Sequence, residues 1–148
     1  MAHRFLYEAT HRILLTEVTG EASSGELLEA LDEIAMIAES RPIVAGVSDL
    51  TAVTAYKSEP AEIKAAARGR MPYRSESTPR YYVSTADYVL GMLHIYRASA
   101  PEVGRFMHIV PTLSDALDAL GAADARFEPI DKPPRPRRRT PQGTSSAG

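Results

Sequence analysis

The sequence predicts an α/β domain with a mixed, mostly parallel sheet and about four covering helices. Short apolar segments alternate with amphipathic ones along most of the chain, which is the pattern of strands joined by helical crossovers. The clearest example is the stretch 81–120, which reads as strand, polar turn, helix, strand and helix. The length of 148 residues suits one domain with a single core.

The chain opens with two segments that favour strands, residues 4–10 and 12–19. The short connection between them predicts a tight turn, so we expect these strands to be antiparallel to each other. Ser23 and Glu26 then have the spacing of a capping box, which places the start of a helix there.

That first helix is the most clearly amphipathic segment of the chain. We assign Glu29, Asp32 and Glu33 to its outer face, so the solvent side of the helix is expected to be acidic. The inward face is expected to consist of the apolar residues that recur at helical spacing: Leu27, Leu28, Leu31, Ile34, Ala35 and Ala38.

A third strand and a second helix follow. The apolar run 43–47 is typical of a buried strand, and we expect that strand to end at Ser48–Asp49. Ser58 has the right position to cap a helix that begins at Glu59–Pro60, because proline fits the first turn of a helix. Residues 69–79 are predicted to form a polar loop.

The second half of the chain repeats the alternation. Residues 81–83 and 106–110 are the predicted strands, and residues 88–96 and 113–120 are the predicted helices. A polar turn, residues 84–87, joins the first strand to its helix. These parallel crossovers and the antiparallel first pair together give the mixed sheet.

The composition excludes several kinds of chemistry. The chain has no cysteine, which excludes disulfides, thiolate nucleophiles and cysteine-ligated metals. Motifs for phosphate-binding loops, nucleophile elbows and metal sites are absent, so we predict no catalytic residue, no cofactor and no metal. No apolar run approaches the ~20 residues that span a bilayer, and we expect a cytoplasmic protein without a transmembrane segment.

Charge is unevenly distributed along the chain. Residues 131–148 hold five basic groups and one acidic group, which leaves 12 basic and 18 acidic groups in residues 1–130. The folded body, net −6, repels phosphate backbones and is not expected to bind nucleic acid. The Pro- and Arg-rich segment 131–148 cannot bury enough apolar surface to fold, so we predict a domain at 1–130 and a disordered basic tail after it.

Polar residues follow two of the predicted strands. Asp49 and Thr51 come after the strand 43–47, and Thr85 and Asp87 come after the strand 81–83. Ligands of open α/β sheets bind beyond the carboxyl ends of the strands, so these four side chains form a candidate rim for a polar ligand or a partner protein. The alternative is that Thr85 caps a helix and Asp49 closes a turn.

The helix 88–96 provides a second group of candidates. Its apolar positions, Tyr88, Met92 and Tyr96 among them, cover an arc of about 160°. Gly91 borders this arc and would let another backbone approach closely. The helix is therefore either well buried between the sheet and a neighbouring element, or it presents one edge to a second copy of the chain or to a ligand.

Three motifs in a fixed order resemble the small bacterial SpoIIAA-like members of the STAS group. They are Val47-Ser-Asp-Leu-Thr-Ala-Val53, Asp87-Tyr-Val-Leu-Gly-Met-Leu-His-Ile-Tyr96 and Ile109-Val-Pro-Thr-Leu-Ser-Asp-Ala-Leu117. The resemblance covers roughly residues 4–121. It implies the fold of that group and a regulatory role through binding to a protein partner or to a second copy of the chain.

The resemblance also singles out Ser58. Counted without a gap from Asp49, Ser58 stands where the phosphorylated members of the STAS group carry their phosphoacceptor. Lys57 and Pro60 depart from the acid and the glycine of that motif. The alternative is that Ser58 only caps the helix that follows it.

Three functional hypotheses follow from the sequence. The first is a non-catalytic STAS-like regulatory or protein-interaction module. The second is a domain that binds a small molecule or lipid in a pocket beside the Tyr88–Tyr96 helix, because SpoIIAA-like chains distantly resemble the CRAL-TRIO lipid-transfer fold. Such a pocket should have a volume of roughly 300 Å³ or more.

The third hypothesis is an enzyme that uses Asp49, Asp87 or His94. It requires two of these groups to converge on one cleft. Asp87 and His94 lie seven residues apart, which separates them by ~10 Å along a helix and makes them unsuitable as a hydrogen-bonded pair. We therefore do not expect an enzyme.

Overall fold

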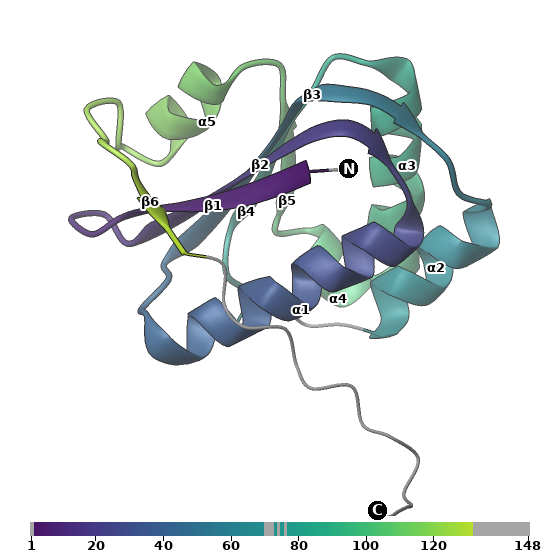
Figure 1. The fold of residues 1–148 in the computed structure, drawn as a ribbon, viewed down its shortest axis with the longest axis horizontal. Helices are drawn as coiled ribbons and strands as arrows, with labels where there is room; N and C mark the ends of the chain where they lie inside the picture. Colours follow the sequence, from purple (N-terminus) through teal and green to yellow (C-terminus); the bar gives the residue numbers. More distant parts are fainter. Residues whose placement is uncertain (1, 70–72, 74, 76, 132–148) are drawn as a thin grey trace, which may run out of the picture.

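The computed structural model describes residues 2–69, 73, 75 and 77–131, which form one six-stranded sheet and five helices (Figure 1). The strands are β1 (Ala2–Glu8), β2 (Ile13–Ala22), β3 (Ala45–Tyr56), β4 (Arg80–Val83), β5 (Met107–Val110) and β6 (Glu128–Ile130). The helices are α1 (Ser24–Ser40), α2 (Pro60–Gly69), α3 (Asp87–Ser99), α4 (Pro101–Gly104) and α5 (Leu113–Ala119).

The strand order in the sheet is β5-β4-β3-β2-β1-β6. Strands β2, β3, β4 and β5 are parallel to one another, whereas β1 pairs antiparallel with both β2 and β6. The predicted fold class, a mixed and mostly parallel sheet with an antiparallel first pair, is thus confirmed. The sequence analysis missed β6, a three-residue edge strand whose central Pro129 is tolerated because an edge needs fewer backbone donors.

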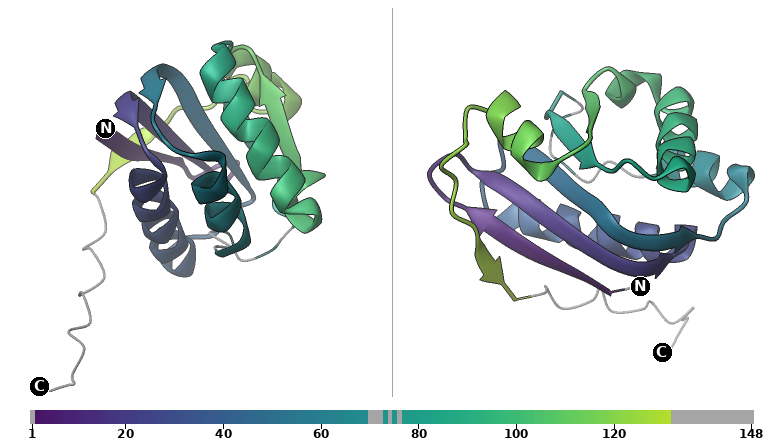
Figure 2. Two further views of the ribbon diagram at one scale, coloured as in Figure 1. Left: turned by 90° about the vertical axis from the view of Figure 1, so that its right-hand side faces the viewer. Right: turned by 90° about the horizontal axis from the view of Figure 1, so that it is seen from above.

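Helices cover both faces of the sheet. Helices α1, α2 and α3 lie side by side on one face, as the left view of Figure 2 shows, and α5 covers the opposite face. Alternating residues of β2 explain this division, because Leu14 packs with α1 while Ile13 and Leu15 pack with Ala116 of α5. The core is therefore two apolar layers separated by the sheet.

Strand β3 extends well beyond its predicted end. It continues to Tyr56 instead of stopping at Ser48–Asp49, so Asp49 lies inside the strand and does not close a turn. Strand β2 supplies the reason, because it is ten residues long and pairs with β3 as far as Ala22 and Tyr56. Pairing with β4, by contrast, ends at Asp49 and Val83.

Helix starts follow the sequence rules in two cases. Ser23 Oγ accepts a hydrogen bond from the Glu26 N–H at 3.4 Å, which confirms the predicted cap of α1. Thr112 Oγ1 likewise accepts from the Asp115 N–H at 3.0 Å at the start of α5.

Two further predictions concern the C-terminal tail and membrane-spanning helices. The predicted disordered tail lies outside the described residues apart from Asp131, so the domain limits 1–130 and 131–148 stay a prediction. Within the part of the chain that is described, none of the helices has the length and hydrophobicity needed to cross a bilayer.

Candidate functional site

The predicted rim lies where β4 and β5 end. Asp49 is in register with Val83, and Val83 with Val110, so Asp49 and the carboxyl ends of β4 and β5 lie at one level of the sheet. Asp49 Oδ1 accepts hydrogen bonds from the N–H of Thr51 at 3.1 Å and from its Oγ1 at 2.6 Å. The Asp49 carboxylate and the exposed Thr51 thus form a small polar group on β3.

Thr85 and Asp87 continue this rim at the start of α3. The cap position belongs to Ala86, which makes no side-chain cap bond, and the nearby Ser84 Oγ accepts from the Ala86 N–H at 3.1 Å. The alternative assignment of Thr85 as a helix cap is therefore wrong. Thr85 and Asp87 are both exposed, which leaves them available to a partner.

Ser58 has a different structural role from the predicted one. Its Oγ accepts a hydrogen bond from the Ser24 N–H at 2.6 Å, in the first turn of α1. At the N-terminus of helix α2, the side-chain hydrogen bond comes instead from Glu62, whose carboxylate accepts from the Glu59 N–H at 2.8 Å. Ser58 therefore does not cap α2, and its half-buried hydroxyl connects the segment after β3 to α1.

The candidates on α3 divide into buried and exposed residues. Met92 and Tyr96 are buried in the core with α2, whereas Tyr88 is 44% exposed and donates its hydroxyl to the Val53 carbonyl of β3 at 2.6 Å. Gly91 is exposed, and a Cβ added there would meet no atom within 4 Å. The expected close approach of another backbone at Gly91 is therefore absent among the described residues.

We expect Gly91→Ala to stabilise the protein by about 0.5–1 kcal/mol, because alanine loses less backbone entropy in a helix interior than glycine does. Chemical denaturation followed by circular dichroism measures this change. A loss of stability would contradict the open surroundings of Gly91. Gly25→Ala, in the first turn of α1 and 4.0 Å from the nearest side-chain atom, is the matched control.

A small apolar cavity lies between the sheet and the helix layer, with a volume of ≈ 70 Å³. It is lined by Thr16 of β2, by residues of α1 and α3, and by four tyrosines: Tyr56, Tyr73, Tyr82 and Tyr96. Thr16 is 2% exposed, and its hydroxyl has no hydrogen-bond partner among the described residues. The cavity is far below the roughly 300 Å³ of a typical ligand pocket.

Burial changes the acid–base chemistry of these tyrosines. It raises the pKa of Tyr73 to about 12 and raises the pKa of Tyr82 well above its ordinary value. The pKa values of Tyr56 and Tyr96 are also raised, again mainly by burial. All four phenols are therefore neutral at physiological pH.

We expect the protein to lose stability as the pH rises from about 10 towards 12. In this range the unfolded tyrosines ionise near their ordinary pKa of 10.0, while Tyr73 stays neutral in the folded state up to about 12. Denaturation midpoints measured across this range test the expectation. Tyr82→Phe should reduce this loss of stability. An unchanged fall of the denaturation midpoint with pH in that variant would contradict this explanation.

The three residues of the enzyme hypothesis form no hydrogen-bonded or ion-paired set among the described residues. No hydrogen bond or ion pair links any two of Asp49, Asp87 and His94 among the described residues, and His94 lies exposed on α3. The only bonds found for Asp49 within these residues come from Thr51.

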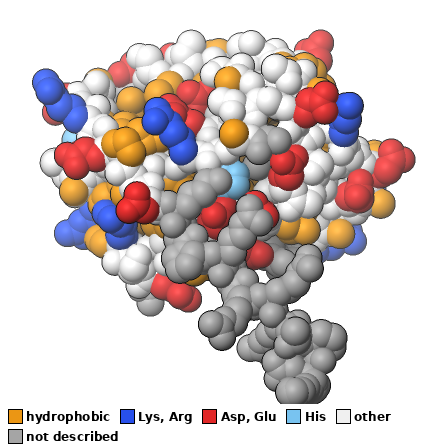
Figure 3. Space-filling model, in the orientation of Figure 1, with side chains coloured by type: hydrophobic (Ala, Val, Ile, Leu, Met, Phe, Trp, Pro, Cys, Tyr) orange, Lys and Arg blue, Asp and Glu red, His pale blue; other side chains and the backbone are white. Residues whose placement is uncertain are grey.

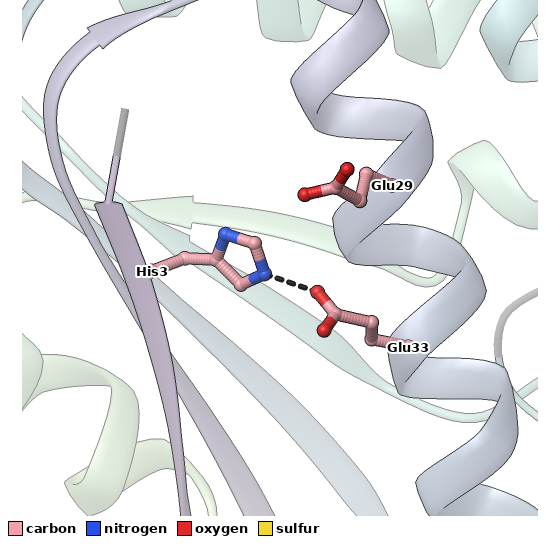
Figure 4. Close-up of side chains that lie close together, drawn as sticks. All are labelled: His3, Glu29 and Glu33. Atoms are coloured by element: carbon pink, nitrogen blue, oxygen red, sulfur yellow. Dashed lines mark hydrogen bonds and ion pairs between the residues drawn. The ribbon is translucent and has the colours of Figure 1, made fainter. Parts of the chain in front are cut away.

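Sequence analysis missed a cluster formed by His3 of β1 with Glu29 and Glu33 of α1 (Figure 4). Glu33 was assigned to the solvent face, but it is only 2% exposed, and its Oε1 contacts Nε2 of the buried His3. The ligand atoms of the three residues lie within 4.8 Å of one another. This finding corrects the predicted acidic outer face of α1.

A weak signal for this cluster exists in the sequence. His3 and Phe5 are two residues apart in a strand, so they point to the same face, and their rings pack edge to face with centroids 5.4 Å apart. Glu29 and Glu33 are four residues apart and share one side of α1. Only the packing of α1 on β1 brings the two sets together.

Comparisons with known proteins support the fold. No protein-family model and no curated protein matches the chain. The structure of the anti-sigma factor antagonist SpoIIAA in its unphosphorylated form is similar, at 13% identity and a TM-score of 0.54, over 79% of this chain and 96% of that chain. The structure of the Bacillus cell fate determinant SpoIIAA in the phosphorylated form is similar at 10% identity and a TM-score of 0.50, over 78% and 98% of the two chains. The resemblance inferred from the sequence is thus confirmed at the level of architecture, and the chain has the SpoIIAA fold.

Proposed function

We propose that this protein is a regulatory protein-interaction module and not an enzyme. The SpoIIAA fold carries the proposal, because two similar solved structures are those of SpoIIAA, an anti-sigma factor antagonist, in its unphosphorylated and phosphorylated forms. No hydrogen bond or ion pair joins any two of Asp49, Asp87 and His94 among the described residues, which adds support, since an acid–base pair needs hydrogen-bond reach.

The binding surface that we propose is the rim formed by Asp49, Thr51, Thr85, Asp87 and Tyr88. Apart from the half-buried Asp49, these residues are exposed, and none of the five belongs to an apolar core cluster. A partner can therefore bind them without disturbing the fold. The carboxylates of Asp49 and Asp87 favour a partner surface that carries basic side chains.

The proposal includes Ser58 as the residue whose modification would control binding. Its hydroxyl is held at the first turn of α1, where the helix dipole favours negative charge. An intact-mass measurement on protein purified from its own cells would show an added phosphate, and Ser58→Ala should remove that mass. An unmodified mass under all growth conditions would remove Ser58 from the proposal.

Site-specific crosslinking tests the proposed surface. A photoreactive amino acid at Thr85 should crosslink the protein in its own cells to one recurring protein or to a second copy of the chain. The same amino acid at Glu39, which is exposed in the last turn of α1, is the control and should give no such product. Equal products at both positions, or none at Thr85 together with a strictly monomeric mass, would contradict the proposal.

The cavity supports a second candidate function, the binding of a small molecule that is mostly apolar but carries one hydrogen-bonding group. The unpartnered hydroxyl of Thr16 inside an apolar lining is the observation that favours it, since such a group gains a hydrogen bond from a ligand. The volume of ≈ 70 Å³ restricts the ligand to a few heavy atoms and does not suit a lipid chain.

Native mass spectrometry tests this second candidate. Protein from its own cells should retain a small ligand, and Ala30→Leu, which fills part of the cavity lining, should abolish the retained mass. The absence of any bound molecule in the unmodified chain would remove this function. Crosslinking at Thr85 is unaffected by that outcome, so the two candidates are tested separately.

A further inference from the structure

We propose that His3, Glu29 and Glu33 bind one divalent transition-metal ion, with Zn²⁺ as the representative. The three residues offer one nitrogen and two carboxylate oxygens within 4.8 Å of one another. Figure 4 shows the imidazole of β1 facing two carboxylates that project from successive turns of α1. The cluster shares no residue with the proposed rim, so the inference is independent of the proposed function.

The donor set selects the class of metal. A mixed set of imidazole nitrogen and carboxylate oxygen suits Zn²⁺ and its first-row neighbours, and three protein ligands leave a fourth position for water. Mg²⁺ and Ca²⁺ prefer sites made of oxygen alone. We therefore expect Zn²⁺ and Co²⁺ to bind and Mg²⁺ to bind far more weakly.

The burial of the cluster supports a cation at this position. The side chains of His3 and Glu33 are each only 3% exposed, and a carboxylate so far from water is costly unless cations or donors surround it. Within the described residues, the contact with His3 is the only hydrogen bond or ion pair found for Glu33. Its second oxygen therefore retains unused acceptor capacity, which a cation would satisfy.

The charge around the cluster points in the same direction. The donor set contains two carboxylates and one imidazole, a combination that favours a cation. The face that carries α1 and β1 shows acidic side chains beside a histidine near its middle (Figure 3). A small separation of His3 and Glu33 would admit the ion, which would replace the proton that the two side chains share.

Calorimetry with the untagged full chain tests the proposal. Titration with Zn²⁺ at neutral pH should show one ion per chain, and the heat should depend on the buffer because metal binding releases a proton. Co²⁺ should give the visible absorption spectrum of a site with imidazole and carboxylate ligands. Titration with Mg²⁺ under the same conditions should show binding at least tenfold weaker, on the order expected from ligand type.

Matched variants identify the ligands. Glu29→Gln keeps the buried His3–Glu33 contact and should weaken Zn²⁺ binding by about tenfold or more, since even the loss of an outer partner of a metal ligand costs 10–100-fold. Asp32→Asn, on the same helix but outside the cluster, should bind Zn²⁺ like the unmodified chain. Circular dichroism confirms that each variant is folded.

Several results would overturn the proposal. They are the absence of saturable Zn²⁺ binding, equal affinity for Zn²⁺ and Mg²⁺, and equal weakening by Glu29→Gln and Asp32→Asn. Retention of full Zn²⁺ affinity in a folded His3→Gln variant would also exclude the site. Any of these outcomes leaves an ordinary buried ion pair between β1 and α1.

Discussion

Replacing Gly46 by alanine is expected to destabilise the protein by about 2–3 kcal/mol, at the upper end of the usual cost of overpacking. A Cβ at Gly46 would overlap the hydroxyl and Cζ of Tyr73 and would lie 3.0 Å from its Cε1. Gly46 is the second residue of β3 and is paired with Leu14 on one side and Arg80 on the other, so its backbone has little freedom to move away.

The Tyr73 side chain cannot easily move away from the added methyl group either. It is 5% exposed, and the Arg80 guanidinium lies 5.1 Å from the centre of its ring. Arg80 is itself buried and donates from Nε to the Thr78 carbonyl at 3.1 Å and from Nη2 to the Ser75 carbonyl at 3.2 Å. The added methyl group therefore strains a tyrosine that is held by its neighbours.

Denaturant titration measures this effect as a lower midpoint with an unchanged slope. Tyr73→Ala in the Gly46→Ala background should cost less than Tyr73→Ala alone, because the shortened side chain no longer collides. Additive losses in this double-mutant cycle would show that the collision with Tyr73 is not the cause. A Gly46→Ala protein of normal stability would contradict the close packing at β3.

Removal of His3 is the second change with a large expected effect. His3→Ala should destabilise the protein by about 3–5 kcal/mol, because it leaves the buried Glu33 carboxylate without a partner. Glu33→Ala should cost less, because it removes the buried carboxylate itself and leaves only an imidazole, whose burial is less costly than that of a carboxylate. A larger loss of stability in His3→Ala than in Glu33→Ala distinguishes a buried polar pair from a simple loss of packing volume.

A double-mutant cycle checks this interpretation. The double variant His3→Leu, Glu33→Leu should have nearly the same free energy of unfolding as the unmodified chain, because two apolar side chains replace two buried polar ones. All measurements are made by denaturation in the presence of a chelator, so that bound metal does not add stability to the unmodified chain. Equal and additive losses for the two single variants would contradict the coupling.

The parts of the fold that were predictable depend on local chemistry. The caps at Ser23 and Thr112 follow from side chains that reach backbone N–H groups three residues away. The mixed, mostly parallel sheet and its crossovers follow from the alternation of short apolar runs with amphipathic segments. These features can be predicted from local sequence, without knowing which helices and strands contact one another.

The parts that were not predictable depend on contacts between distant segments. Glu33 looks like a surface residue in its helix, and only His3, thirty positions away, makes its burial tolerable. Strand β3 looks complete at Asp49, and only the length of β2 keeps it extended to Tyr56. Ser58 looks like the cap of α2, but the neighbouring α1 supplies the N–H that it accepts.

The length of β3 has a consequence for the edge of the sheet. Beyond Asp49 the strand keeps β2 on one side, but on the other side no described strand accompanies Leu50–Tyr56. Such an edge is a template for pairing with another extended chain. The Tyr88 hydroxyl donates to one backbone acceptor of this edge, the Val53 carbonyl. A residue of the proposed rim therefore already occupies an acceptor that an added strand would use.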